Sequence, residues 1–328
     1  MVVKTKFTKK DITKILSEYL IGDLISFEST AKGTVQTNIF IKTTKAKFVL
    51  RYYENRSKNS VLFEVNLIKY LKDKKYPCPK IFKNKKRQFI SIYNHKPYVI
   101  FEFIEGKHVK RPNKYQKKEL IKKVAELQNL TKNYPSQYKR YRLNYNIATC
   151  KKLAEGELKR LKTIDSKEKE KWIKSELNNL ELPKSLPKGI CHCDFHFSNI
   201  LFKNGEFNAL IDFDDANYTY TTFDLICLIE PFISSFTWKT WDKFKPTDNV
   251  LNLKKTKKII SEYQKYRPLN NIEKKYLFDV YKLSILIDCI WYFERGNAKD
   301  FYEKREIDYL NAFGREEFYK QIFGGELD

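Results

Sequence analysis

The sequence predicts an α+β chain with a strand-rich first part and a mainly helical second part. Short runs of β-branched and aromatic residues, bounded by polar and turn-forming segments, occupy most of the first hundred or so residues. Beyond Gly106, apolar residues recur at the three- and four-residue spacing of helices. A short island of strand-like segments interrupts this helical pattern between residues 189 and 215. We therefore expect two lobes, residues 1–104 and 105–328, with a cleft between them.

The first lobe should open with a helix over residues 8–20, where Thr8 is a suitable N-cap and apolar residues share one face. A second helix is expected over residues 58–73, because Val61, Val65 and Ile68 recur at helical spacing. The strands of this lobe are expected at residues 24–29, 37–43, 47–53, 88–94 and 97–105.

The second lobe is expected to consist mostly of helices. Their predicted ranges are 115–131, 149–180, 221–234, 252–266 and 271–297. The intervening island reads GICHCDF, NILFK and NALIDFD, three short apolar segments with unusually dense polar residues between them. Polar residues that conflict with flanking hydrophobic strands indicate a functional site.

The composition indicates a folded protein with a basic surface. Among 328 residues, 64 Lys and Arg face 40 Asp and Glu, which gives a formal net charge of +24. The lysines are spread along the whole chain, and the only tight cluster is KNKKRQ at residues 83–88. A solvated surface explains this distribution better than a nucleic-acid site does, so we expect no nucleic-acid partner.

The cysteines and the hydropathy pattern predict a cytoplasmic protein. The six cysteines are scattered, and Cys191 and Cys193 have neither the C-x-x-C nor a zinc-site spacing, so we expect free thiols in a reducing compartment. No apolar run approaches the roughly 20 residues of a membrane span. The first residues, MVVKTKFTKK, have no apolar segment typical of a signal peptide.

The island carries a set of residues suited to phosphoryl transfer. This reaction needs a carboxylate near the incoming hydroxyl and oxygen ligands for Mg²⁺ on the phosphates. Asp194 fits the first role, and Asn199 and Asp212 fit the second. The Asn-Gly pair at 204–205 predicts a hairpin turn that would bring Asn199 and Asp212 to one end.

The pattern H-x-D-x-x-x-x-N, followed by I-D-F, resembles the catalytic and metal loops of the aminoglycoside phosphotransferase/choline kinase superfamily. Cys193 stands where protein kinases have Arg, and Asp214 stands where they have Gly; both differences match the small-molecule branch. The resemblance implies a two-lobed protein-kinase-like fold and transfer from ATP, with Mg²⁺, to a hydroxyl of a small molecule. It makes Asp194 the catalytic residue and Asn199 and Asp212 the metal ligands.

The same resemblance assigns the nucleotide contacts. It places Arg51 at the position that touches the ATP phosphates, with Glu64 on the next helix as its partner. The backbone around Glu102, Phe103 and Ile104 should hold the adenine.

Other residues near the island take supporting or open roles in this resemblance. The loop TAKGTVQTN, which contains Gly33, should cover the phosphates. Asp224 should brace the catalytic loop, and His192 should hold that loop in place. His196 could contact substrate or pack within the loop, and Asp214 could bind metal or substrate or cap the following helix.

Within the superfamily the chain is most similar to the homoserine kinases of the kinase-fold type, in the segments LISFESTAKGTVQTNIFIKTTKAKFVLRYYE and FEVNLIKYLKDKKYPCPKI and in the island. Homoserine O-phosphorylation is therefore the leading expectation. An aminoglycoside or choline-type phosphotransferase is the alternative. The positive net charge of the protein opposes binding of polycationic aminoglycosides, whereas the acidic residues Asp214, Asp215 and Glu230 near the predicted site could still attract them. A basic, nucleic-acid-binding pseudokinase is the alternative of another class, and the complete catalytic set weighs against it.

Overall fold

The computed structural model describes residues 4–30, 35–109, 111–161, 165–233, 252–291, 293 and 304–327. They form two compact units, each assembled from separate stretches of the chain. Unit 1 comprises Met1–Pro112, Asn133–Arg142 and Phe197–Ala216, and unit 2 comprises Asn113–Lys132, Leu143–His196 and Asn217–Asp328. No helix within the described ranges is long and apolar enough to cross a membrane. The division into functional lobes at residue 104 stays a prediction.

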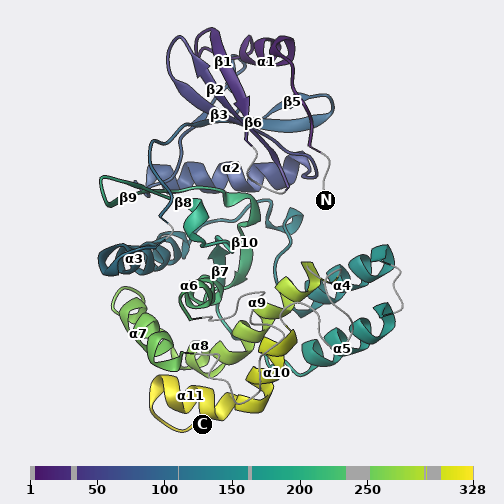
Figure 1. Cartoon of the computed structure of the whole chain (residues 1–328), viewed down its shortest axis with the longest axis vertical. Helices are drawn as coiled ribbons and strands as arrows, with labels where there is room; N and C mark the ends of the chain where they lie inside the picture. Colours follow the sequence, from purple (N-terminus) through teal and green to yellow (C-terminus); the bar gives the residue numbers. More distant parts are fainter. Residues whose placement is uncertain are drawn as a thin grey trace. The chain divides into compact units, whose positions relative to one another are not determined.

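Unit 1 is built on an antiparallel sheet in the order β1-β2-β3-β6-β4, with β5 also paired to β6 (Figure 1). The strands are β1 Leu24–Ser29, β2 Thr37–Thr43, β3 Lys47–Tyr52, β4 Ile81–Phe82, β5 Ser91–Tyr93 and β6 Lys96–Glu102. Buried and more exposed residues alternate along β2, as a sheet with one covered face requires. The helix α1 (Lys9–Leu16) packs its apolar face into the core formed with β1, β2 and β3.

The helix α2 (Lys58–Asp73) packs against β4 and β6 of the same sheet. Ser57 caps its first turn by accepting a hydrogen bond from the Ser60 N–H, which satisfies a donor that the helix itself cannot pair. The hairpin of β8 (Ile200–Lys203) and β9 (Glu206–Leu210) also belongs to unit 1. The short turns η1 (Lys139–Tyr141) and η3 (Phe213–Asp215) both contact α2.

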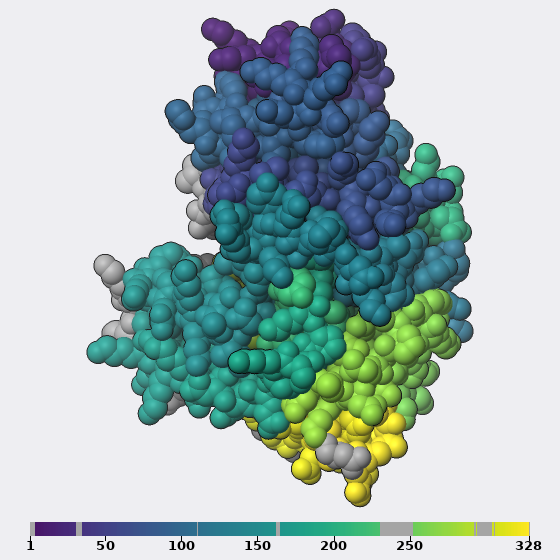
Figure 2. Space-filling model, turned by 180° about the vertical axis from the view of Figure 1, so that it is seen from behind, coloured from purple at the N-terminus to yellow at the C-terminus, as the bar shows by residue number. Residues whose placement is uncertain are grey.

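Unit 2 is helical apart from the antiparallel pair of β7 (Lys188–Cys191) and β10 (Asn217–Tyr220). Its helices are α3 Lys114–Thr131, α4 Ile147–Leu161, α5 Ser166–Asn178, α6 Phe223–Ile233, α7 Leu253–Gln264, α8 Asn271–Lys275, α9 Leu277–Trp291, α10 Lys304–Phe313 and α11 Arg315–Phe323. The central α9 is buried almost all round and packs against α4, α5, α6, α8, α10 and α11. Figure 2 shows the C-terminal residues (yellow) beside the green residues of α7 and α8, which α11 contacts.

Three predicted helices differ from the structure in their limits. The helix expected over 8–20 ends at Leu16, and Ser17 is its C-cap. The helix expected over 149–180 is replaced by α4 and α5, and the one expected over 271–297 is replaced by α8 and α9. The first range is broken before α5, whose N-cap position is Asp165, and the second is broken at Tyr276, the C-cap of α8. Apolar periodicity alone could not show these breaks.

Candidate functional site

Arg51 is the centre of the charged cluster in unit 1. Its Nη1 lies 3.2 Å from Oε1 of Glu64 and 2.9 Å from Oδ1 of Asp212. Its Nε donates to Oδ1 of Asn38, the residue opposite it on β2. Burial alone would lower the pKa of Arg51, but the carboxylates of Asp212 and Glu64 raise it well above its ordinary value. The guanidinium is therefore permanently charged and held from three sides.

Glu64 is fully buried on α2 and accepts hydrogen bonds from Arg51 and from the Tyr53 hydroxyl, at 3.2 and 2.9 Å. Burial raises the pKa of Glu64 to about 7, while the charge of Arg51 opposes this shift. The predicted pairing of Arg51 with Glu64 is therefore present in the structure. A buried carboxylate of this kind is stable as an anion only next to such a partner.

The two predicted metal ligands lie at one end of the β8–β9 hairpin. Ile200 pairs with Leu210 across the hairpin, and the N–H of Ile211 donates to the carbonyl of Asn199 at 2.9 Å. Asn199 therefore sits opposite the residue that precedes Asp212, as expected from the Asn-Gly turn. Asp212 has a left-handed backbone with φ of 64°, a conformation that Asp tolerates better than most residues.

This donor set fits a magnesium ion bound to a nucleotide. An amide oxygen and a carboxylate are hard ligands, and Mg²⁺ is held in such enzymes by one or two carboxylates together with substrate phosphates and water. The Asp212 side chain is 38% exposed, so it can reach a ligand, whereas Asn199 is mostly buried. Within the described ranges, no group of three or more His, Cys, Asp or Glu forms a metal cage of its own. Phosphate oxygens would complete the coordination.

Asp214 is buried, with 5% of its surface exposed, and its carboxylate is already bonded within the protein. Arg56 donates to both carboxylate oxygens, at 3.0 and 3.1 Å, and Gln36 donates to Oδ2 at 2.9 Å. Burial would raise the pKa of Asp214, but Arg56 and its other partners lower it below the ordinary value. These contacts inside the protein are not among the roles that the sequence left open for Asp214, and binding of metal or substrate by Asp214 stays a prediction.

In unit 2 the loop that carries Asp194 is held by Asp224. This fully buried carboxylate at the start of α6 accepts the N–H of His192 at 2.9 Å and that of Cys193 at 2.8 Å. Gln128 on α3 adds a third hydrogen bond at 3.0 Å. Burial raises the pKa of Asp224 to about 6, although these donors lower it. Asp224 occupies the bracing position that the resemblance implies.

The bracing fixes an unusual backbone just before Asp194. Cys193 has φ of 63°, in the left-handed region that non-glycine residues seldom adopt. The two N–H groups held by Asp224 come from His192 and Cys193, so they fix this turn from one side. His192 is buried, Asp194 is half-buried and His196 is exposed. His192 Nδ1 accepts the N–H of Asp194 at 3.3 Å, a contact that agrees with the expected role of His192 in holding the loop, and the Asp194 side chain is partly accessible.

The predicted adenine-binding segment lies at the end of β6. The N–H of Glu102 donates to the carbonyl of Lys80 at 2.8 Å, and its side chain accepts the N–H of Lys80 at 3.0 Å. The ring of Phe103 lies 5.5 Å from that of Phe40, centre to centre, in an edge-on contact. The Glu102 N–H is thus engaged by Lys80, and adenine binding by the backbone of Glu102, Phe103 and Ile104 stays a prediction. The predicted contact of Gly33 lies outside the described residues.

Three residues near this cluster were not singled out in the sequence: Gln36, Arg56 and Arg142. Arg142 donates to the backbone carbonyl of Asp214, and to that of Ala216 at 2.9 Å. These partners are far apart in the sequence, and no local pattern marks such pairs. Only the fold of unit 1 brings them together.

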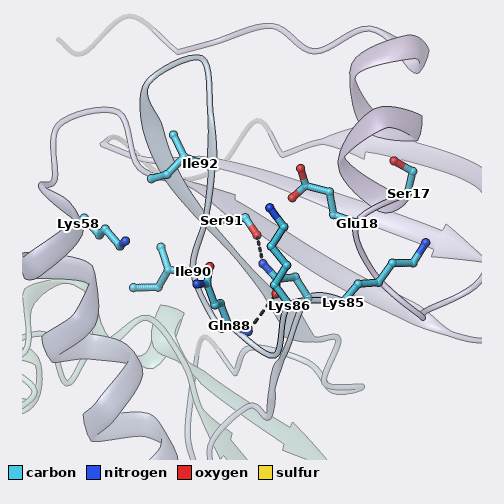
Figure 3. A pocket seen from close by; sticks show the side chains of 10 residues that line it. Ser17, Glu18, Lys58, Lys85, Lys86, Gln88, Ile90, Ser91 and Ile92 are labelled. Atoms are coloured by element: carbon cyan, nitrogen blue, oxygen red, sulfur yellow. Dashed lines mark hydrogen bonds between the residues drawn. The ribbon is translucent and has the colours of Figure 1, made fainter.

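A separate pocket of about 460 Å³ lies in unit 1 beside β5 (Figure 3). Figure 3 shows Lys58, Lys85 and Lys86 around it, and two of these lysines belong to the basic cluster at 83–88. Lys85 and Lys86 are exposed, which agrees with the prediction that the lysines lie on a solvated surface. None of the described residues that line this pocket is a predicted site residue.

Two of the solved structures that match this fold are a kinase and a phosphotransferase. An amicoumacin kinase in complex with AMP-PNP, Ca²⁺ and amicoumacin matches with a TM-score of 0.67 and 16% identity, over 96% of this chain and 94% of that one. A spectinomycin phosphotransferase in complex with ADP and spectinomycin matches with a TM-score of 0.62 and 13% identity, over 98% and 99%. These matches confirm the predicted kinase-like fold.

Sequence relatives point to the same class of enzyme. The homoserine kinase of Agrobacterium fabrum is 26% identical over 95% of this chain and 89% of its own length. The homoserine kinase of Bartonella henselae is 29% identical over 95% and 90%. Residues 27–266 match the model of the phosphotransferase enzyme family. Because this match covers well over half of the sequence, the chain belongs to the phosphotransferase enzyme family.

Proposed function

We propose that the protein transfers the terminal phosphoryl group of ATP, with Mg²⁺, to the side-chain hydroxyl of homoserine. The observation that carries the chemistry is the double contact of Arg51 with Glu64 and Asp212. A guanidinium held between a helix glutamate and a metal-ligand carboxylate is suited to binding phosphate oxygens. Homoserine is chosen as the substrate because the relatives named homoserine kinase are 26–29% identical to this chain over most of their length.

Each residue has a distinct task in this proposal. Arg51 binds the nucleotide phosphates, and Asn199 and Asp212 hold the metal ion against them. A metal ion held by these two residues would supply positive charge to offset the charge that develops on the phosphates during transfer. Asp194 orients the hydroxyl of homoserine and accepts its proton. The backbone of Phe103 and Ile104 holds the adenine.

The divalent metal is proposed as Mg²⁺ from the ligand chemistry alone. The solved amicoumacin kinase contains AMP-PNP and Ca²⁺, which supports a nucleotide and a divalent cation in this fold. Asp212 and Asn199 offer few protein ligands, an arrangement that suits a small cation that retains water and phosphate oxygens.

An acceptor screen tests the proposed function. ATP consumption by the purified chain is measured with homoserine, choline, simple sugars and aminoglycosides, with Mg²⁺ and with EDTA. We expect homoserine to give the highest kcat/KM and EDTA to abolish turnover. Turnover of an aminoglycoside but not homoserine would retain the kinase chemistry and reject the substrate. ATP consumption that Asp194→Ala leaves unchanged would reject the mechanism.

A further inference from the structure

Two arginines from separate segments of unit 1 converge on Asp214. Arg56 lies just before α2 and forms two parallel hydrogen bonds with the carboxylate, from Nε to Oδ1 at 3.0 Å and from Nη2 to Oδ2 at 3.1 Å. Its Nη2 also lies 3.1 Å from Oδ1 of Asp215. Arg142 donates to the backbone carbonyl of Asp214, to which Arg56 Nη2 also donates at 3.3 Å. Such bidentate pairs fix orientation as well as charge.

The same two arginines also connect Asp214 to the first turn of α2. Arg142 Nη1 donates to the hydroxyl and the carbonyl of Ser60, at 3.0 and 3.2 Å. Arg56 immediately precedes Ser57, the N-cap of α2. The helix that carries Glu64 and the segment that carries Asp212 are therefore joined by groups that are themselves buried or half-buried.

A third connection comes from Gln36, directly before β2. Its Nε2 donates to Asp214 at 2.9 Å and to Asn55 at 3.0 Å, and its Oε1 accepts the N–H of Glu54 at 2.8 Å. Gln36 is itself buried and belongs to the loop TAKGTVQTN, which is predicted to cover the phosphates. Asp214 thus bonds to three separate segments, which carry Gln36, Arg56 and Arg142. The proposed function requires these segments to keep fixed positions relative to one another.

We propose that Arg56 is a positioning residue for phosphoryl transfer, and that through Asp214 it fixes Asp212 at the distance from Arg51 that nucleotide-bound Mg²⁺ requires. The inference rests on the proposed function, because it concerns the same metal ligand. Asp212 is only two residues from Asp214, in a left-handed backbone whose angles depend on its neighbours. A shift of this segment would move the carboxylate away from Arg51 without removing any ligand.

The test compares Arg56→Gln, Arg56→Lys and a matched control, Arg315→Gln. Arg315 forms an equally bidentate pair with the buried Asp279 of α9, at 2.7 and 2.9 Å, within unit 2. The dissociation constant of the non-hydrolysable nucleotide AMP-PNP is measured by calorimetry over a range of Mg²⁺ concentrations. We expect Arg56→Gln to raise the half-saturating Mg²⁺ concentration at least tenfold and to lower kcat, with the KM for homoserine unchanged within twofold. Arg56→Lys should show a smaller shift, and Arg315→Gln should lower Tm but leave the Mg²⁺ dependence unchanged.

A double variant guards against misfolding. Arg56→Gln with Asp214→Asn removes both charges, so no unpaired charge is left buried. It should fold and show the same shift in Mg²⁺ dependence. Hydrogen exchange at the amides of Ile211 and Ala216, measured without nucleotide, should be at least tenfold faster in this variant than in Arg315→Gln.

The possible outcomes separate the two proposals. A wild-type chain that binds AMP-PNP equally with and without Mg²⁺ contradicts the proposed function, and the exchange measurement still tests the role of Arg56. Unchanged exchange at Ile211 and Ala216 in the double variant overturns the positioning role. The positioning role is also overturned if Arg56→Gln lowers Tm as much as Arg315→Gln does but leaves the Mg²⁺ dependence of AMP-PNP binding unaltered.

Discussion

Arg51 and Asp212 form an ion pair in unit 1, with 2.9 Å between Nη1 and Oδ1, although they come from distant parts of the sequence. The same guanidinium nitrogen contacts Glu64, so one side chain joins β3, α2 and the segment after β9. A planar guanidinium can make such contacts at fixed angles, whereas an ammonium is a point charge. This geometry makes Arg51 the first position to test.

Replacing Arg51 with Lys keeps the charge but removes the fork of donors. We expect the KM for ATP to rise at least about tenfold, because one ammonium cannot hold Glu64, Asp212 and a phosphate together. Steady-state kinetics with varied ATP measure this change. Arg267→Lys is the control, since Arg267 also pairs with a buried glutamate, Glu273, but in unit 2. An ATP KM that is the same in Arg51→Lys and the control would contradict a phosphate-binding role.

Replacing Asp212 with Asn keeps the size of the side chain and removes its charge. We expect kcat to fall by at least about a hundredfold, and the affinity for ATP to become insensitive to Mg²⁺, because a neutral amide binds Mg²⁺ poorly. Calorimetry with and without Mg²⁺ reports the second effect separately from turnover. The control is Asp308→Asn, which removes an exposed pair with Lys304 on α10. Retained Mg²⁺ dependence in Asp212→Asn would rule out this ligand.

The stability of unit 2 should depend on pH through Asp224. Burial raises the pKa of Asp224 from 3.8 to about 6 in the folded protein, so the folded state binds this proton more tightly than the unfolded state. The stabilisation is therefore complete below about pH 4 and is lost as the pH rises through 6. The shift of about two units corresponds to roughly 3 kcal/mol.

Denaturant unfolding of the wild type and of Asp224→Asn at pH 4, 5, 6 and 7 measures this effect. We expect the free energy of unfolding of the wild type, relative to the variant, to decrease by roughly 2 kcal/mol between pH 4 and pH 7, because part of the change occurs below pH 4. The other titrating groups are common to both proteins and cancel. A difference that stays constant or increases with pH would show that the pKa of Asp224 is not raised.

The sequence predicted much of unit 1 because its elements have local signals. The limits of the helix 58–73 and of the strands 24–29 and 37–43 agree with the structure. Each shows a clear period or β-branched run, with polar or turn residues beside it. The strand β10 was not predicted, since NYTY has no apolar run and is ordered by pairing with β7.

The candidate site could be predicted only where a motif or a short turn fixed it. The hairpin that brings Asn199 beside Ile211 follows from the Asn-Gly turn, and the pairing of Arg51 with Glu64 follows from the family resemblance. The bonds of Asp214 with Arg56 and Gln36 depend on tertiary folding, because each joins residues far apart in the chain. Nothing local distinguishes Asp214 in the sequence from a metal ligand.

Phosphorylation of homoserine by the wild type and by Asp194→Asn is the most direct measurement of the proposed function. The product is quantified with [γ-³²P]ATP, and kcat/KM is compared with that for kanamycin at low and physiological salt, because screening weakens the repulsion of a polycation by the basic surface. We expect wild-type kcat/KM to be at least about tenfold higher for homoserine at both salt concentrations, and Asp194→Asn to reduce kcat at least about a hundredfold while circular dichroism stays unchanged. A higher kcat/KM for kanamycin at both salt concentrations would contradict the substrate, and a folded Asp194→Asn variant with near wild-type turnover would contradict the mechanism.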